Sequence, residues 1–508
     1  MIRVFLSFSF LLMLLASALA SAGADMDAIV REHWFEAKSA HFNIYSCGTT
    51  QEVNKLAARL EQFHDAFGLL AGAQAVSSPP INVMAFPDQD SLDPFLPVYQ
   101  GKPANLSGFF KRSSDENLIV IALSGTNSGS MRTIFHEYTH LLFRRNMRFW
   151  PLWLQEGMAE MYSTFEVNGR TVRIGAPIQH HLRLLEESEL MPLKELLAVD
   201  HDSPQYNESE HQGVFYAESW LLTHFLMNGD NTVLKARFGN FTKLLMQGVP
   251  QEQAFTRALG MPLKSVEAEL RRYLKRGEFE PVTYVVAADL SAPRRVAIRP
   301  IGPAETCFRL GDELLRIGRL DEAEAQFKHA QQLAPQSPLP YEGLGLLAEA
   351  RDQPDESIHQ LEESFQRGSV SFLAYYIYAE EKLHKMGDGH GNYTRFSKDA
   401  EDDIRAKAER SIALMPNFAR AHELLGFVDL VQGENLGAAE EQFQRAIQLE
   451  PENQAFQLML AQAQILSHDP EAARHTLETL LQPQVDAKIR AQAEVEMKQV
   501  EQYEQRRR

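Results

Sequence analysis

Residues 131–145 read MRTIFHEYTHLLFRR, and this stretch determines how the first half of the chain is interpreted. Its apolar residues recur at helical spacing, which predicts an α-helix. His136 and His140 are four residues apart, so their imidazoles project about one turn apart from one face of that helix. Both can bind one zinc ion as neutral groups, while Glu137, displaced around the helix, can reach a metal-bound water. The stretch therefore predicts a zinc-binding helix that also carries a general base.

A second motif, WLQEGMAE at residues 153–160, offers the third ligand. Sixteen positions separate His140 from Glu156, which is enough to end one helix, turn, and return on a second helix facing the first. Glu156 can then complete a His–His–Glu site whose fourth position is open to water. A third histidine six positions after His140 is excluded, because that position is Asn146. The alternative, a helix with two surface histidines, is disfavoured by the apolar character of the helix and by this second motif.

The two motifs resemble those of the gluzincin metallopeptidases, both the aminopeptidase N-like branch and the bacterial secreted peptidase-MA-like proteins with C-terminal tetratricopeptide repeats. The resemblance implies an α+β zincin-like catalytic domain with one Zn²⁺ per chain, held by His136, His140 and Glu156. It also implies that Glu137 is the catalytic acid/base. Tyr216 occupies the place of the tyrosine that stabilises the oxyanion in aminopeptidase N-like enzymes, with an ordinary buried aromatic as the alternative.

Other features of this resemblance remain open. The motif that captures a free amino terminus is absent, so the choice between endopeptidase and exopeptidase action is undecided. The strand predicted at residues 118–123 corresponds to the edge strand that pairs with an extended substrate. Glu160, one turn after Glu156, either orients a ligand histidine or is solvated. Three further histidines lie in polar stretches and are expected at the surface: His180, His181 and His211.

The domain preceding the repeats, residues 25–280, is predicted to combine a small sheet lobe with a helical lobe. Apolar residues at helical spacing predict a helix over residues 51–70. Short β-rich runs predict strands at residues 41–46, 81–86, 108–111 and 118–123. From residue 131 to about residue 277 strand signals stop, and helical spacing takes over.

The second half of the chain repeats itself. In a 34-residue frame starting at Ala304, apolar and small residues recur at the positions of a tetratricopeptide unit. The first copy has Leu310, Gly311, Ala323, Phe327, Ala330 and Pro335, and a later copy has Leu425, Gly426, Ala439, Phe443, Ala446 and Pro451. We therefore predict an all-α repeat solenoid over residues 304–484, a linker over 281–303, and a capping helix and tail over 485–508. Such a solenoid presents a concave surface for a protein or peptide partner, or serves only as a packing platform.

The N-terminal residues have the layout of a secretory signal. A short basic start precedes an apolar run and small-residue cleavage sites, so residues 1–24 are predicted to be a signal peptide. An uncleaved anchor is the alternative. No later segment is apolar enough to span a membrane. We therefore expect an exported protein, periplasmic or secreted, with no membrane span after signal cleavage.

Composition narrows the function further. A chain of 508 residues predicts two to four domains. The net charge of −18, from 68 acidic and 50 basic residues, argues against a nucleic-acid partner. Only Cys47 and Cys307 are present, too few for a cysteine-ligated metal. We hypothesise a zinc-dependent peptidase whose repeats recognise a protein or peptide. The alternative is a catalytically retired zincin-fold binding or envelope assembly protein that acts through its repeats.

Overall fold

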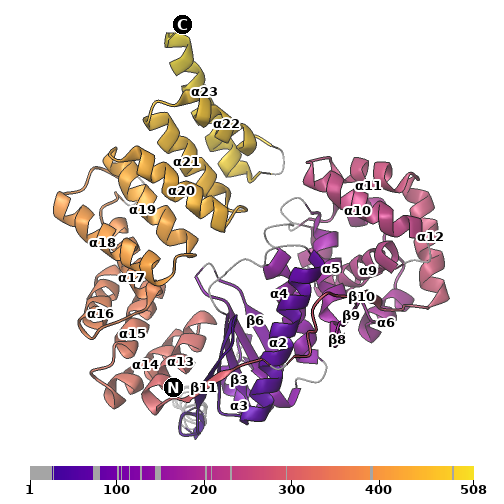
Figure 1. Cartoon of the computed structure of the whole chain (residues 1–508), viewed down its shortest axis with the longest axis horizontal. Coiled ribbons are helices and arrows are strands. Elements are labelled where there is room, and N and C mark those ends of the chain that lie inside the picture. The colour runs from indigo at the N-terminus through magenta and orange to yellow at the C-terminus, as the bar shows by residue number, and fades with distance from the viewer. Residues whose placement is uncertain are drawn as a thin grey trace, which may run out of the picture.

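The computed structural model describes residues 26–507, apart from residues 27, 72–80, 100, 101, 105, 114, 126–128, 144–149, 201, 202, 208, 229–231, 293, 389–392, 483 and 484. The predicted signal segment, residues 1–24, lies outside the described residues. Figure 1 shows the helical lobe and the repeats rising on opposite sides of a central sheet.

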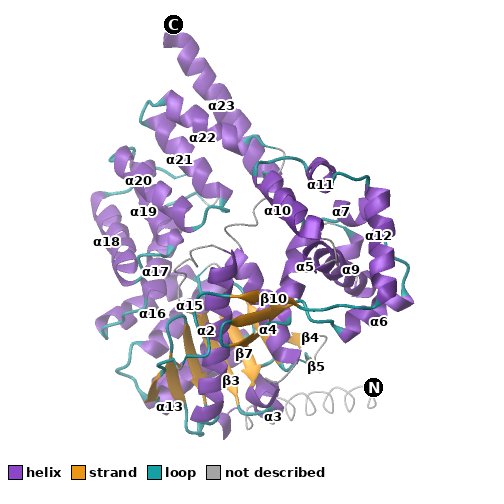
Figure 2. Ribbon diagram, turned by 45° about the vertical axis from the view of Figure 1, so that its right-hand side comes forward, coloured by secondary structure: helices purple, strands orange, loops and turns teal. Residues whose placement is uncertain are grey.

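The central sheet has six strands among the described residues, in the order β11-β1-β2-β3-β7-β6. Figure 2 draws the strands in orange. Its strands are β1 (Phe35–Lys38), β2 (Phe42–Ser46), β3 (Ile81–Phe86), β6 (Gly108–Lys111), β7 (Leu118–Ala122) and β11 (Ala297–Pro300). β2, β3 and β7 run parallel, whereas β1, β6 and β11 are antiparallel to their neighbours. The strands predicted from the β-rich runs are confirmed. β4 (Val98–Tyr99) and β5 (Lys102–Pro103) form a separate pair.

The prediction that residues 118–123 form the edge strand is wrong. β6 pairs with β7, with Gly108 opposite Ile121 and Lys111 opposite Leu118, so β6 is the outer strand. All five residues of β7 are buried, which is typical of a strand covered on both faces and paired on both sides. Among the described strands, the outer edge beside the predicted zinc helix is therefore that of β6.

Both faces of the sheet are covered. Side chains alternate along each strand, so β3 and β7 contribute one apolar set to each face. One set, Val83, Ala85, Ile119 and Ile121, packs in a core with α2 (Thr50–Ala71) and α4 (Gly129–Phe143). The other set, Met84, Phe86, Val120 and Ala122, packs with Phe308, Leu310 and Leu314 of the first repeat helix, α13 (Pro303–Arg316). The short helix α3 (Gln89–Leu92) adds Leu92 to that second core.

The stretch predicted to be a linker, residues 281–303, supplies strands to two sheets of the first half. β11 pairs with β1 at the edge of the central sheet. β10 (Val282–Val285) pairs with β9 (Thr171–Ile174), which also pairs with β8 (Glu166–Asn168). The prediction that strands stop after residue 131 is therefore wrong. β8 and β9 are too short to give a clear strand signal in the sequence, and their partner β10 comes from a distant part of the chain.

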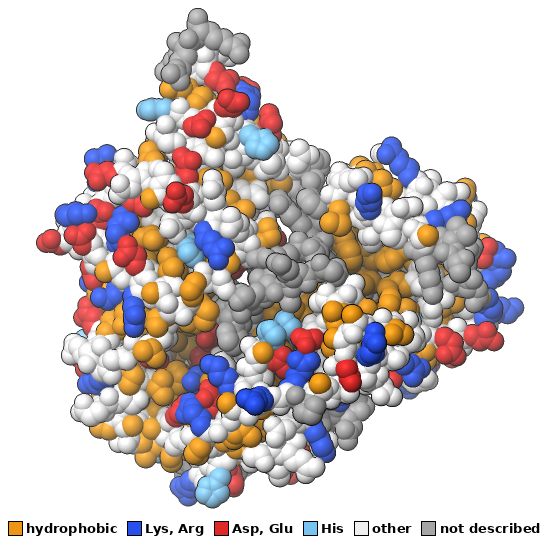
Figure 3. All heavy atoms as spheres, viewed as in Figure 1, with side chains coloured by type: hydrophobic (Ala, Val, Ile, Leu, Met, Phe, Trp, Pro, Cys, Tyr) orange, Lys and Arg blue, Asp and Glu red, His pale blue; other side chains and the backbone are white. Residues whose placement is uncertain are grey.

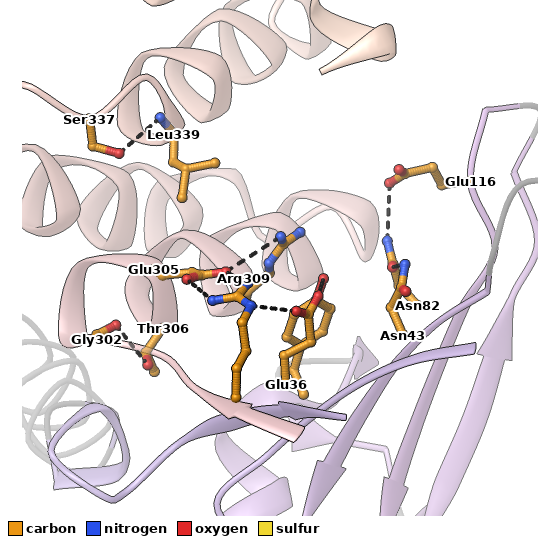
Figure 4. A network of polar contacts seen from close by, with 12 residues as sticks. Glu36, Asn43, Asn82, Glu116, Gly302, Glu305, Thr306, Arg309, Ser337 and Leu339 are labelled. Carbon is orange, nitrogen blue, oxygen red and sulfur yellow. Dashed lines mark hydrogen bonds and ion pairs between the residues drawn. The ribbon is translucent and has the colours of Figure 1, made fainter. Parts of the chain in front are cut away.

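A polar network joins β11 to the first repeat (Figure 4). Arg299 donates to Glu36 over 2.6 Å and to Glu305 over 2.7 Å. Because α13 begins at Pro303, only two residues separate the sheet edge from the repeats. The repeats are therefore held directly against the sheet.

The helical lobe is built around α9 (Ser209–Asn228), which packs against α5 (Leu152–Ser163). A β-carbon added at Gly157 of α5 would lie 2.4 Å from the carbonyl oxygen of Ser219, so only glycine allows this approach. The remaining helices of the lobe are α6 (Gln179–Glu187), α7 (Leu193–Ala198), α8 (Pro204–Asn207), α10 (Thr232–Met246), α11 (Gln251–Leu259) and α12 (Leu263–Arg276).

The repeats form five helix pairs within the described part of the chain. These are α13 with α14 (Leu320–Leu333), α15 (Leu339–Ala350) with α16 (Pro354–Gln366), α17 (Phe372–His384) with α18 (Lys398–Leu414), α19 (Ala419–Gln432) with α20 (Leu436–Leu449), and α21 (Gln454–Leu466) with α22 (Pro470–Leu480). A β-carbon added at Gly311 would lie 2.6 Å from the Phe327 ring, and one added at Gly426 would lie 3.0 Å from the Phe443 ring. The same small–large contact thus recurs in two copies, as the repeat frame predicted.

The long helix α23 (Ala487–Arg507) follows the last pair, in the place of the predicted capping helix. On the face shown in Figure 3, Lys and Arg side chains are interspersed with Asp and Glu side chains. Among the described helices, each is too short or too polar to cross a bilayer.

Candidate metal centre

Three side chains from α4 and α5 converge on one point. The Nε2 atoms of His136 and His140 are 3.2 Å apart. Glu156 Oε2 lies 3.2 Å from His140 Nε2 and 3.3 Å from His136 Nε2. The structure thus brings together the three residues that the sequence predicted as ligands.

The dimensions of this triangle fit a tetrahedral zinc ion. Zinc lies about 2.0–2.1 Å from imidazole nitrogen and about 2.0–2.2 Å from carboxylate oxygen, so two ligands of a tetrahedron are about 3.3 Å apart. The three edges of the donor triangle, 3.2, 3.2 and 3.3 Å, match that spacing. Two imidazoles and one carboxylate are also a donor set that zinc accepts, with a fourth position left for water.

A second layer of polar contacts surrounds the ligands. Glu160 Oε1 lies 3.3 Å from His136 Nδ1, the nitrogen that faces away from the donor triangle. The other oxygen of Glu160 lies 3.2 Å from Nε2 of His181 on α6. Of the two roles left open for Glu160, this placement favours orienting a ligand histidine.

The prediction that His181 is a surface residue is wrong, because only 6% of it is exposed. His181 and Leu185 are four residues apart on α6 and form its buried face. That spacing was a signal in the sequence that His181 points inward. His180 is exposed as predicted, and the side chain of His211 lies outside the described residues.

The metal-free site holds a proton on histidine and a negative charge on glutamate. Burial opposes the charged form of His136, but its contacts with Glu156 and Glu160 outweigh burial and raise its pKa to about 10. Burial likewise opposes ionisation of Glu156, yet contacts with the two histidines lower its pKa to about 2. The carboxylate is therefore ionised and ready to bind a cation at neutral pH.

Zinc binding is expected to release about one proton per ion at pH 7. The raised pKa of His136 keeps this imidazole protonated in the metal-free protein, whereas zinc binds only the neutral form. Lowering the pH therefore weakens binding, and zinc affinity should rise about tenfold per pH unit between pH ~7 and ~9. Calorimetry in buffers of different ionisation enthalpy measures the released proton. A zinc affinity that stays constant over this pH range contradicts the prediction.

Glu160→Gln is expected to weaken zinc binding roughly tenfold to a hundredfold, because His136 loses its charged partner. Competition with a chromophoric chelator measures the affinity. Glu166→Gln, on the exposed strand β8, is the matched control and should bind zinc as the wild type does. Equal affinities in the two variants contradict a role for Glu160 in orienting His136.

Glu137 and Tyr216 lie near the donor triangle. The ring of Tyr216, on α9, is centred 5.9 Å from the ring of His136. Burial raises the pKa of Tyr216, and the charges of Glu156 and Glu137 add to that effect. The Tyr216 hydroxyl therefore remains protonated and can donate a hydrogen bond.

Sequence reasoning missed Tyr206, on α8. It forms a side-chain hydrogen bond with Tyr216, and their rings are centred 6.4 Å apart. No pattern in the sequence links the two tyrosines, since the link depends on the packing of α8 against α9.

Comparisons with known families match separate parts of the chain. Sequence models of the tetratricopeptide repeat match residues 304–337 and 430–494. The second half of the chain is a tetratricopeptide-repeat domain. Domains of this kind generally bind proteins or peptides. Residues 130–245, which include the candidate metal centre, match a family described as "Protein of unknown function (DUF1570)".

No curated protein matches the chain. Among solved structures, the repeats are similar to YrrB, described as a TPR protein with an unusual peptide-binding site, at 18% identity and a TM-score of 0.32, covering 38% of this chain and 91% of YrrB. MamA is 20% identical with a TM-score of 0.30, covering 35% of this chain and 90% of MamA. A thermophilic TPR protein from Thermus thermophilus is 19% identical with a TM-score of 0.28, covering 38% of this chain and 98% of that protein.

Proposed function

We propose that this protein is a zinc-dependent peptidase whose repeats bind the protein or peptide substrate. The observation that carries the proposal is the donor triangle of His136, His140 and Glu156, with edges of 3.2–3.3 Å. The contact between Glu160 and His136 supports it, because the second ring N–H of a metal-binding histidine usually donates a hydrogen bond to such a partner.

Bound zinc would supply a Lewis acid and lower the pKa of its water. Side chains of the protein take up the proton of the attacking water and stabilise the negative charge that develops on the substrate. Glu137 accepts the proton of the attacking water and can return it to the leaving amine. The Tyr216 hydroxyl donates a hydrogen bond to the carbonyl oxygen of the scissile bond as negative charge develops there.

The free edge of β6 supports a peptide as the substrate. β6 packs along α4, and the Oγ atoms of Ser107 and Ser130 are 2.6 Å apart where the two elements begin. The backbone groups on the outer side of β6 have no partner strand among the described residues. An extended peptide can pair with them and lie along the zinc helix.

Metal analysis combined with a peptide library tests this function. The purified protein should hold about one zinc per chain and cleave a subset of a diverse peptide library. A chelator should abolish cleavage and added zinc should restore it. Absence of zinc contradicts the proposal. Bound zinc without cleavage of any peptide favours the alternative, a retired zincin-fold binding or envelope assembly protein.

We further propose that the protein acts outside the cytoplasm, in the periplasm or after secretion. The support is the layout of residues 1–24 as a signal peptide. Sequencing the amino terminus of the protein purified from its native host tests this. A mature chain that still begins at Met1 in the cytoplasmic fraction contradicts it.

A further inference from the structure

A groove of about 440 Å³ lies where the repeats face the β6–β7 turn. Ser113 and Asp115 of that turn form one wall. The inner helices of the first four repeats, α13, α15, α17 and α19, form the remainder. The groove therefore belongs to both halves of the chain.

The groove continues the line of the β6 edge. β6 ends at Lys111, and Ser113 in the groove wall is two residues further along. Between them lies Arg112, whose charge acts on Tyr206: burial and Glu156 raise the pKa of Tyr206, while Arg112 opposes the rise. A peptide paired with β6 would lie along α4, which carries His136 and His140, and would reach the groove wall at Ser113 within a few residues.

Ion pairs fix the turn against the repeats. Arg316 of α13 lies 2.6 Å from Glu116 and 3.4 Å from Asp115. It also lies 3.2 Å from Asp312, and only 9% of its side chain is exposed. The groove is thus built into the junction.

The groove wall carries an excess of negative charge. Four carboxylates, those of Asp115, Asp312, Glu349 and Glu380, face two guanidinium groups, those of Arg316 and Arg420. Both arginines already contact acids of the wall, Arg316 as described and Arg420 at 2.8 Å from Glu380. Burial and the nearby charges of Glu380 and Glu381 raise the pKa of Glu349. Among the described residues of the wall, carboxylates therefore outnumber guanidinium groups by two.

The groove also has an apolar part. Leu346, Leu373 and Ile377 line it beside the carboxylates. A lysine or arginine side chain suits such a site, because its aliphatic stem can lie on the leucines while its charged end reaches Glu349.

We propose that this groove binds a lysine or arginine side chain of the substrate, a few residues from the bond that is cleaved. The inference rests on the proposed function in taking the peptide on β6 to be the substrate. According to this inference, the repeats prefer substrates with a cationic residue. That residue would lie at a fixed number of positions from the bond that is cleaved.

The test measures peptide binding to the zinc-loaded full chain carrying Glu137→Gln, so that hydrolysis does not interfere. The probes are fluorescein-labelled peptides of an otherwise uncharged sequence, in which one lysine is moved through successive positions. At one or two positions lysine should tighten binding roughly fivefold to tenfold relative to glutamine, as expected for a partly screened ion pair. Glu349→Lys should remove that increment, and Glu349→Gln should reduce it.

The matched control is Glu409→Lys, which changes the same charge on the exposed face of outer helix α18 and should leave the lysine preference intact. Equal binding of lysine and glutamine peptides at every position, or a preference unaffected by Glu349→Lys, overturns the proposal. The two proposals fail separately. Lysine preference without cleavage by the wild type refutes only the peptidase function, and cleavage without lysine preference refutes only the role of the groove.

Discussion

Glu137→Gln is expected to retain zinc and lose peptide hydrolysis, with kcat lowered roughly a hundredfold to ten-thousandfold. The donor triangle consists of His136, His140 and Glu156, so the substitution removes none of its atoms. Glutamine has nearly the shape of glutamate but cannot accept a proton from water at neutral pH. Metal content and hydrolysis should therefore separate in this variant.

Metal retention is measured as zinc content per chain. Hydrolysis is measured as the initial rate on a peptide that the wild type cleaves. Glu187→Gln, an exposed glutamate at the end of α6, controls for the loss of one charge and should leave both properties unchanged. Hydrolysis by Glu137→Gln at more than a tenth of the wild-type rate contradicts the assignment of Glu137 as the base. Loss of zinc from Glu137→Gln would show that Glu137 helps to bind the metal.

Gly157→Ala is expected to destabilise the first half by about 3 kcal/mol, which is large for one methyl group. The new β-carbon would lie 2.4 Å from the carbonyl oxygen and 2.9 Å from the carbonyl carbon of Ser219. A helix backbone cannot move aside as a flexible side chain can, so α5 and α9 must separate. Glu156 directly precedes Gly157, so zinc affinity should fall as well.

Urea unfolding, followed by tryptophan fluorescence, measures the change because Trp153 and Trp220 are buried in this lobe. Gly239→Ala, in α10, is the control, since no atom lies within 4 Å of its added β-carbon. It should be neutral or stabilise the protein by about 0.5–1 kcal/mol. If Gly157→Ala proves as stable as Gly239→Ala, then the close approach of α5 and α9 does not depend on glycine.

Local patterns predicted four of the six described strands of the central sheet, but not their order. The runs at residues 81–86 and 118–123 have the composition of buried strands, and both are strands. β11 pairs with β1 from a distant part of the chain, and nothing in its own composition specifies that partner. The choice between β6 and β7 as the edge strand likewise depends on which neighbours arrive, which is a property of the whole fold.

The convergence of the three candidate ligands was predictable because the spacing of two of them is set by helix geometry. His136 and His140 lie on one helix, and Glu156 lies on the next after a short connection. His181 and Tyr206 were not found because they reach the site from α6 and α8, whose positions depend on tertiary packing. The partition into two independent domains was also incomplete, since the first repeat helix covers one face of the sheet.

That shared core affects how the protein is made and how it can be divided. A fragment ending near residue 280 lacks β11 and loses the part of the cover over Met84, Phe86 and Val120 that α13 supplies. Such an exposed apolar sheet face promotes aggregation, so a fragment of this length is a poor choice for expression. During synthesis the sheet can complete its packing only after α13 and α14 have left the ribosome. A fragment that keeps this face of the sheet covered therefore includes at least the first repeat, which ends at Leu333.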